Sequence, residues 1–414
     1  MLRKKGPRLF AIAGLLGLTA PVLAAGEGSG TNNPDLHGLD AGPVAEAPPR
    51  EGMTPFFDID WSVGLRGAYT LESGGGEYSA LATPELTLTH RGLRSDLVVT
   101  GSSELSIDAA GRERLSSLRL GADGAYALDE WSALAGNLDL SLTQADPDDP
   151  SLPANTAIAP LVFAGDASAS ATRKFGRFES RLRGSLGRTV NGETTLNDLS
   201  TIDNSAQNNW RAGTAARLGF EVTPLLTAFA EGGLEWQRFD APDPSLLVYL
   251  DARTASVKTG LGYTLNSAFA AEGAVGVAWR DYDDASLTDA ASLTTEGSVS
   301  FKPDETLSLT ASLDTALAPS TSVPGDTVVS TDAAGNVTYT VNPWLGLRGS
   351  VTHGYDRIIG TGDVQQDSTL GVGLDYSVTD HAAFTADYLF TRIDAPPAPL
   401  SDSHMVAVGV KLSR

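Results

Sequence analysis

Apolar and polar side chains alternate along most of the chain from Phe57 to the C-terminus. At the start of this region Ile59, Trp61 and Val63 share one parity, whereas Asp58 and Asp60 share the other. The same period of two recurs along the chain, most clearly in 306–314 and 369–378. Because successive side chains of a β-strand point to opposite faces, the pattern predicts strands with one apolar and one polar face.

The connections between these segments alternate between short and long. Eight short connections resemble hairpin turns and lie around residues 91–92, 129–130, 175–176, 223–224, 266–267, 303–304, 342–343 and 379–380. Nine longer polar stretches lie near 72–77, 108–112, 145–160, 191–208, 240–250, 283–289, 319–327, 359–367 and 395–402. The alternation predicts about 18 antiparallel strands, with both termini on the side of the short turns. Segments 161–174 and 327–341 alternate weakly, so 16 strands is the alternative.

An even number of strands, with short turns at one end and longer loops at the other, is typical of bacterial outer-membrane barrels. A soluble sandwich has no reason to keep short and long connections in strict alternation. A closed barrel also has no free sheet edge, which a bilayer requires because it cannot satisfy unpaired backbone groups. We therefore predict an all-β fold, a closed antiparallel transmembrane β-barrel with up-and-down topology.

Aromatic side chains concentrate where the predicted strands end. Some follow short turns and others precede long loops, which is the placement expected of two interfacial girdles. The alternative is aromatic packing in a soluble β core, which would place these residues in mid-strand. The candidate girdle residues are Trp131, Trp236, Trp279, Trp344, Tyr355, Phe384 and Phe390.

The first residues have the layout of a secretory signal peptide. Four basic residues precede a short apolar run from Leu9 to Ala20, and small residues up to Ala24 suit a cleavage site. The apolar run is too short to span a bilayer. The sequence therefore predicts a cleaved signal peptide at 1–24, a flexible periplasmic linker at 25–55 and a barrel at 56–414, located in the bacterial outer membrane.

Composition narrows the classes of function. The 414 residues include 51 acids and 29 bases, a formal net charge of −22, and loss of the four bases in the signal peptide makes it −26. This charge argues against a nucleic-acid partner, which requires a basic surface. The absence of cysteine excludes disulfides, thiolate metal sites and cysteine nucleophiles. The five histidines show no catalytic spacing, so we expect no enzyme activity and no catalytic, metal or cofactor site.

If the apolar parity faces lipid, the polar parity lines a lumen with many charges. Basic residues concentrate between residues 177 and 217, whereas later strands are mostly acidic. In a water-filled pore this distribution would set a field across the lumen and bias ion selectivity. The alternative is that the charges neutralise each other and only brace the wall. The candidate lumen-lining residues are Arg66, Arg119, Arg177, Arg181, Arg183, Arg211, Arg217, Glu231, Glu235, Lys258, Glu272, Glu296 and Arg348.

The end of the chain has the pattern of a terminal barrel strand. Val406, Val408 and Val410 alternate with small or polar residues, and Arg414 stands where many such strands have an aromatic residue. The segments FDIDWSVGLRGAYT and ALATPELTLTHRGLRSDLVV and the final VAVGVKL resemble the "putative β-barrel porin" family of outer-membrane proteins. Some members of that family are associated with exopolysaccharide production. The resemblance implies the barrel architecture for nearly all of the mature chain.

These features together lead us to expect a passive channel for small hydrophilic solutes or a conduit for export of a surface polymer. The rivals are a non-conducting structural or adhesion barrel and a secreted soluble β-repeat protein. Loops 145–160 and 191–208 are the longest candidates for a constriction. The expected partners are outer-membrane lipid and lipopolysaccharide, the barrel assembly machinery during biogenesis, and further copies in a homo-oligomer.

Overall fold

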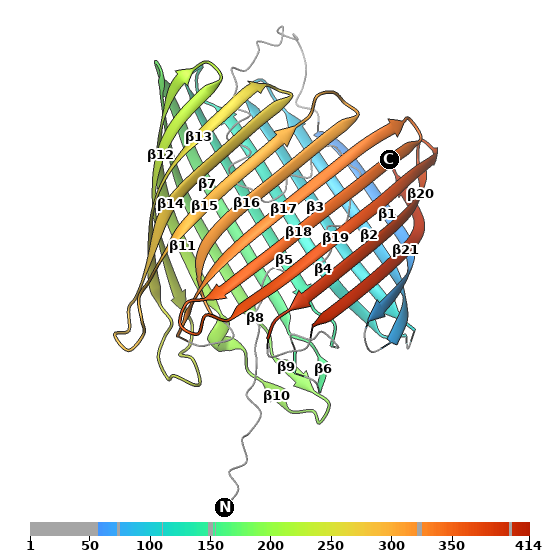
Figure 1. Ribbon diagram of the computed structural model, residues 1–414. Coiled ribbons are helices and arrows are strands. Elements are labelled where there is room, and N and C mark those ends of the chain that lie inside the picture. The colour runs from blue at the N-terminus through green and yellow to red at the C-terminus, as the bar shows by residue number, and fades with distance from the viewer. Residues whose placement is uncertain are drawn as a thin grey trace, which may run out of the picture.

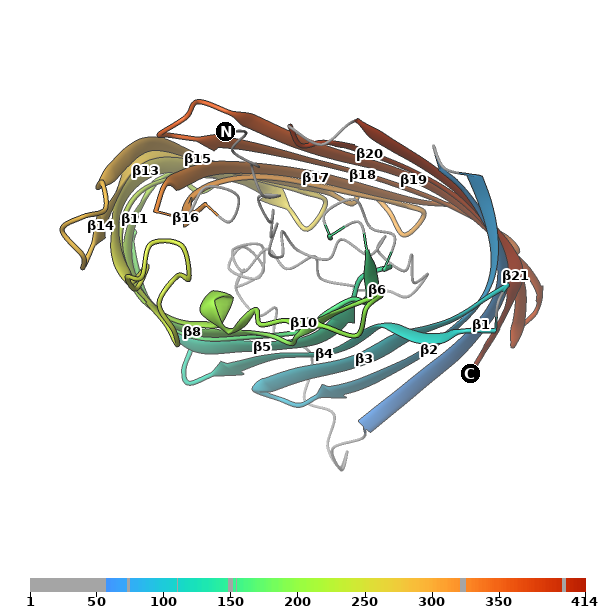
Figure 2. The ribbon, with the colours of Figure 1, turned by 90° about the horizontal axis from the view of Figure 1, so that it is seen from below.

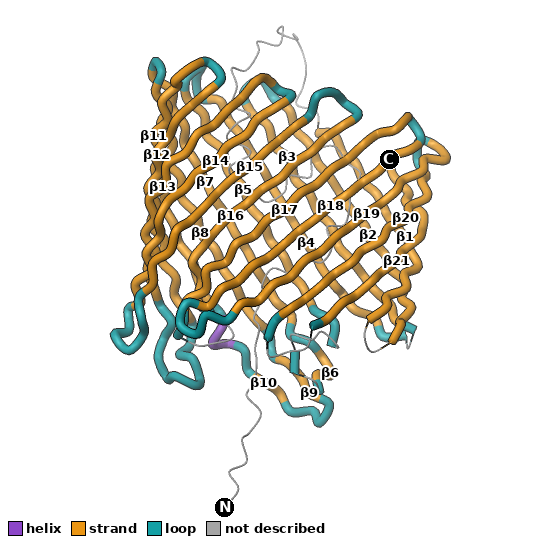
Figure 3. The backbone as a smooth tube through the Cα atoms, in the orientation of Figure 1, coloured by secondary structure: helices purple, strands orange, loops and turns teal. Residues whose placement is uncertain are grey.

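The chain folds into one closed β-barrel, seen in a computed structural model that describes residues 57–72, 75–109, 111–147, 152–153, 155–320, 325–396 and 400–414. Eighteen antiparallel strands form a single sheet that closes on itself (Figure 1, Figure 3). The predicted barrel of 18 strands is confirmed, and the alternative of 16 is set aside. The signal peptide and linker predicted for the first 55 residues lie outside the described part of the chain.

Each barrel strand pairs with its neighbours in the chain, in up-and-down order. The barrel strands are β1 (Phe57–Glu72), β2 (Gly75–Arg91), β3 (Ser95–Asp108), β4 (Glu113–Ala127), β5 (Ser132–Gln144), β7 (Leu161–Phe175), β8 (Phe178–Asn191), β11 (Asn209–Thr223), β12 (Leu226–Phe239), β13 (Ala252–Asn266), β14 (Phe269–Tyr282), β15 (Ala290–Phe301), β16 (Leu307–Pro319), β17 (Thr327–Asn342), β18 (Leu345–Ile358), β19 (Val364–Thr379), β20 (Ala382–Asp394) and β21 (Ser401–Ser413). The two weakly alternating segments are the full-length strands β7 and β17.

The first and last strands close the barrel. Their antiparallel ladder runs from Ser62 opposite Ser413 to Glu72 opposite Ser403. The backbone N–H of Arg414 donates to the carbonyl of Trp61 at 3.0 Å, so the final residue extends this contact. The closure leaves neither terminal strand as an exposed edge.

Short polar side chains stabilise several of the tight turns predicted from the sequence. The side chains of Asn266, Asp304 and Asn342 each accept a hydrogen bond from the backbone N–H two residues later, at 2.8–3.0 Å. Such Asx turns hold a reversal of the chain locally. They define what we call the short-turn end of the barrel, and the opposite rim is the long-loop end.

The outer surface of the barrel is apolar. Leu65, Val257 and Val275 are exposed although they lie in mid-strand, and each has the parity opposite to a charged residue nearby. Such a surface suits lipid, since a water-soluble protein would bury it. None of the described residues forms a helix long and apolar enough to cross a membrane.

The two longest loops contribute a small second sheet. It consists of β6 (Thr156–Ile158), β9 (Thr194–Leu196) and β10 (Thr201–Ile202), and the short 3-10 helix η2 (Ser205–Gln207) follows it. The sheet lies beyond the strands at the long-loop end and, in the view along the barrel, within the outline of its mouth (Figure 1, Figure 2). In the β9–β10 turn, hydrogen bonds from the side chain and the backbone N–H of Ser200 lower the pKa of the Asp198 carboxyl. A constriction formed by these loops stays a prediction.

Candidate functional site: the charged lumen

The side chains predicted to line the lumen lie, with one exception, on the parity opposite to the exposed apolar residues. The residues with inward parity are Arg66, Arg119, Arg181, Arg183, Arg211, Arg217, Glu231, Glu235, Lys258, Glu272, Glu296 and Arg348. They come from nine different strands, so the closed sheet brings them around one interior.

Arg177 is the exception. It lies in the turn between β7 and β8, next to Gly176, whose φ of 63° suits glycine. Its guanidinium donates to the backbone carbonyls of Glu221 and Val222 at 2.8 and 2.6 Å and covers the ring of Phe220. The expectation that Arg177 lines the lumen is corrected, because its turn position makes it a brace at the short-turn rim.

Ion pairs between strands that are not neighbours mark the concave inner face. Arg217 on β11 donates two hydrogen bonds of 2.6 Å to both carboxylate oxygens of Glu272 on β14. Lys258 on β13 reaches Glu296 on β15 at 2.7 Å. The guanidinium of Arg217 also lies 3.4 Å from the centroid of the Phe229 ring, so its position is fixed from two sides.

A second set of ion pairs surrounds Arg348 on the wall formed by β18 to β21 and β1. Its guanidinium contacts Asp375 at 2.8 Å and Asp387 at 3.0 Å, and only 5% of its side chain is exposed. Asp387 also accepts a hydrogen bond from Arg66 at 3.2 Å, and Arg66 lies 3.8 Å from Glu104. This network ties five strands together, so these charges stabilise the wall.

A line of carboxylates crosses the later strands, and the candidate list included only its first member, Glu296. The ladder places Glu296 opposite Asp314, and Asp314 opposite Asp332. Asp332 pairs with Gly354, which in turn pairs with Asp367. Asp356 joins the line through the hydroxyl of Ser330, which donates to it at 2.5 Å. We call Asp314, Asp332, Asp356 and Asp367 the acid row.

The signal for the acid row was present in the sequence as acidic residues on the polar parity of successive strands. Their alignment depends on the strand registers, which the sequence pattern leaves open by several residues. Only the paired ladders show that carboxylates of β16 to β19 form one line along the wall.

Arginines gather on the part of the wall that faces the acid row. We call Arg119 on β4, Arg181 and Arg183 on β8, and Arg211 and Arg217 on β11 the basic band. The barrel is oval in cross-section, and β4, β5 and β8 lie across the lumen from β17, β18 and β19 (Figure 2). Arg119 and the two arginines of β8 therefore face the acid row across the lumen, whereas β11 continues the basic band around the narrow end of the oval (Figure 2).

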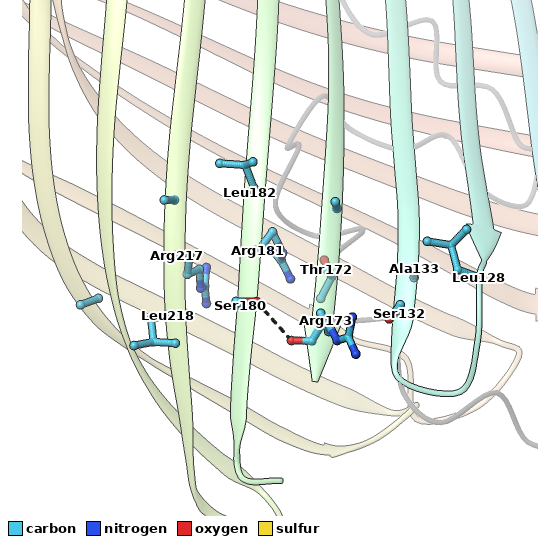
Figure 4. Close-up of a pocket in the computed structure, with 13 residues that line it drawn as sticks. Leu128, Ser132, Ala133, Thr172, Arg173, Ser180, Arg181, Leu182, Arg217 and Leu218 are labelled. Atoms are coloured by element: carbon cyan, nitrogen blue, oxygen red, sulfur yellow. Dashed lines mark hydrogen bonds between the residues drawn. The ribbon is translucent and has the colours of Figure 1, made fainter. Parts of the chain in front are cut away.

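A pocket in the wall adjoins the basic band near the short-turn end. Arg181 and Arg217 line it together with small side chains, among them Ala133, Ala171 and Ala216 (Figure 4). Arg181 lies 3.6 Å from Glu179 on its own strand, so the band also contains acids.

The predicted girdle residues lie near strand ends. Trp131, Trp344 and Phe384 lie at the short-turn end, and more than half of each side chain is exposed. Trp236, Trp279, Tyr355 and Phe390 lie toward the long-loop end. Their role at the membrane interfaces stays a prediction.

Comparison with known proteins identifies the family of the chain. A family model described as "Putative beta-barrel porin 2" matches residues 67–414. Comparison with curated protein sequences gives no match.

Several solved structures are similar to this chain at low sequence identity. The siderophore receptor PirA from Acinetobacter baumannii is 8% identical, with a TM-score of 0.44, and the match covers 87% of this chain and 81% of PirA. The outer membrane protein OpdK from Pseudomonas aeruginosa is 12% identical, with a TM-score of 0.38, and the match covers 86% of this chain and 99% of OpdK. OccK2 (OpdF) from the same organism is 11% identical, with a TM-score of 0.40, over 86% and 98% of the two chains.

Proposed function

Because the chain belongs to the family described as "Putative beta-barrel porin 2" and is an outer-membrane β-barrel, we propose that it is a passive channel for small hydrophilic solutes. The observation that carries the proposal is the pair of opposed charged bands on the inner face of an 18-stranded barrel. Barrels of this size leave an aqueous lumen when no loop or domain fills it. Charges on the wall keep such a lumen wet.

The field between the bands gives the channel its selectivity. The acid row attracts cations to one side and the basic band attracts anions to the other, so a solute with separated opposite charges is oriented as it passes. The ion pairs around Arg348 and Arg217 hold the two walls in place. Arg217 thus both braces the wall and belongs to the basic band, whereas the charges around Arg348 brace the wall alone.

Liposome swelling tests whether the lumen conducts. Vesicles that contain the purified barrel should swell in isotonic solutions of small sugars, and the rate should fall as the sugars become larger. Protein-free vesicles are the control. An absence of swelling with the smallest sugar would contradict the channel and favour a non-conducting barrel. Uniform rates for large and small sugars would contradict a pore for small solutes and favour a wide conduit for a polymer.

Neutralising part of the basic band should make the channel more cation-selective. We expect the variant Arg181→Gln, Arg183→Gln and Arg217→Gln to shift the reversal potential in a KCl gradient toward cations, with roughly a threefold rise in the K⁺/Cl⁻ permeability ratio. Planar-bilayer recordings measure the shift. Arg188→Gln is the control, because Arg188 has outward parity and its guanidinium lies over the exposed ring of Trp210. An unchanged reversal potential in the triple variant would refute the role of the band.

A further inference from the structure

One seam of the barrel is closed along only half of its length. The ladder between β15 and β16 joins residues 296–301 to residues 309–314 and stops there. The ladders between all other neighbouring barrel strands in the described part of the chain run along most of both strands. Toward the long-loop end, residues 290–295 of β15 and 315–319 of β16 therefore have no ladder with each other.

Beyond this point β16 and β17 turn inward together. We call residues 315–319 and 327–329 the arm. Leu317 and Val329 of the arm pack against Ala278, which has inward parity on β14. The hydroxyl groups of Tyr282 on β14 and Thr327 are hydrogen-bonded at 3.0 Å. The arm therefore overlaps the wall from the lumen side, and the view along the barrel shows β16 inside the outline formed by β14 and β15 (Figure 2).

The overlap leaves one strand edge facing the membrane. Leu293 is 75% exposed on the outer surface, whereas its neighbour Thr294 is 3% exposed beneath the arm. Ala291 pairs with Trp279, a candidate residue of the girdle near the long loops. Residues 292–295 lie farther from the long loops than this girdle, and therefore inside the membrane. A backbone edge at this depth cannot be left facing hydrocarbon, because its polar groups would lack partners. The seam must therefore admit something that supplies hydrogen bonds.

The residues along the seam differ from those of the rest of the lumen. The segments AASLTT at 290–295 and TALAP at 315–319 contain no charged residue. Threonine hydroxyls mark the point where the seam opens, since Thr295, Thr315 and Thr331 are linked side by side at 2.9 and 3.3 Å. Pro319 carries no backbone N–H, as is typical of edge positions. The seam thus combines apolar side chains with hydroxyl groups.

From these features we propose that the seam is a lateral port, which the arm covers in this structure and opens by leaving β14, and through which an amphipathic molecule with an alkyl chain and a small polar head passes between the lumen and the outer leaflet. The alkyl chain fits beside Leu293 and Leu317, and the head binds the free backbone edge and the hydroxyls. A strand from a second copy fits less well, because the free edge ends where the ladder begins at Glu296. The port is a function separate from the aqueous channel.

Locking the arm onto β14 with a disulfide tests the port. Because the chain contains no cysteine, only the introduced pair can form this disulfide. The variant Ala278→Cys with Leu317→Cys joins the arm to β14 when oxidised. A second pair, Ala278→Cys with Val329→Cys, joins the same elements if the first variant does not fold. Ser298→Cys with Ser312→Cys is the matched control, because these residues are ladder partners in the closed half of the same seam.

The probe is dodecyl sulfonate with a terminal diazirine, added to phosphatidylcholine vesicles that contain the full chain, and labelled residues are located by peptide mapping. We expect labelling of Thr294 that excess unlabelled dodecyl sulfonate competes away. Oxidation of the first pair should lower this labelling at least tenfold, and dithiothreitol should restore it. Labelling of the lipid-facing Leu293 should not change, nor should labelling of Thr294 in the control pair.

Equal labelling of Thr294 in the oxidised and reduced variants would overturn the port, as would labelling that unlabelled dodecyl sulfonate does not compete. A fall in ion conductance on oxidation, with unchanged labelling, would show that the arm constricts the aqueous pore and would also overturn the port. Switchable labelling in a barrel that fails the sugar-swelling assay would support the port while refuting the channel. Cross-links between two copies through Leu293→Cys would instead identify the seam as a contact between barrels and overturn the proposal.

Discussion

Replacing all four aspartates of the acid row by asparagine should lower the K⁺/Cl⁻ permeability ratio of the reconstituted barrel by roughly fivefold. The side chains keep their size, so the wall should keep its shape while one side of the lumen loses its charge. The ladder sets these carboxylates in one line on adjacent strands, where their fields add. The basic band opposite is then no longer balanced, and anions should enter more readily.

The reversal potential in a KCl gradient measures this effect. Low ionic strength should enlarge the shift, because with less salt the field of the carboxylates is screened less and acts over a longer distance. The matched control replaces four aspartates in connecting segments, Asp198, Asp243, Asp284 and Asp304, by asparagine. Both variants change the net charge equally, so only the position differs. Equal shifts in the two variants would mean that the charge of the whole chain, and not the acid row, sets the selectivity.

The architecture was predictable because the period of two and the spacing of turns are local properties of the sequence. Asx residues such as Asn266 and Asn342 mark turns whatever the rest of the chain does. The same pattern assigned an inner face to most charged side chains. It assigned the wrong place to Arg177, because parity has no meaning inside a turn where the backbone reverses.

The acid row and the arm could not be predicted in this way. The acid row requires the registers of four strands, and each register is set by pairing between strands and not by either strand alone. The arm begins at Thr315, in a segment whose alternation resembles that of its neighbours. Its inward turn depends on contacts such as that of Leu317 with Ala278, which join residues far apart in the chain.

The charge network around Arg348 leads to the largest expected change in stability. Replacing Arg348 by methionine leaves Asp375, of which only 14% of the side chain is exposed, without its guanidinium partner. Removing one member of a buried ion pair leaves an uncompensated charge, and we expect a loss of about 3 kcal/mol in the free energy of unfolding. Asp387 is affected less because it keeps its hydrogen bond from Arg66 at 3.2 Å.

Urea unfolding from phosphatidylcholine vesicles, followed by the fluorescence of the six tryptophans, measures this loss. Arg188→Met is the control, since Arg188 lies near the long-loop end of β8 and its partner Asp240 is accessible to water. The double variant Arg348→Met with Asp375→Leu should recover most of the stability, because it removes the unpaired carboxylate together with the guanidinium. If the double variant is less stable than Arg348→Met alone, the cost lies in lost packing and not in the buried charge.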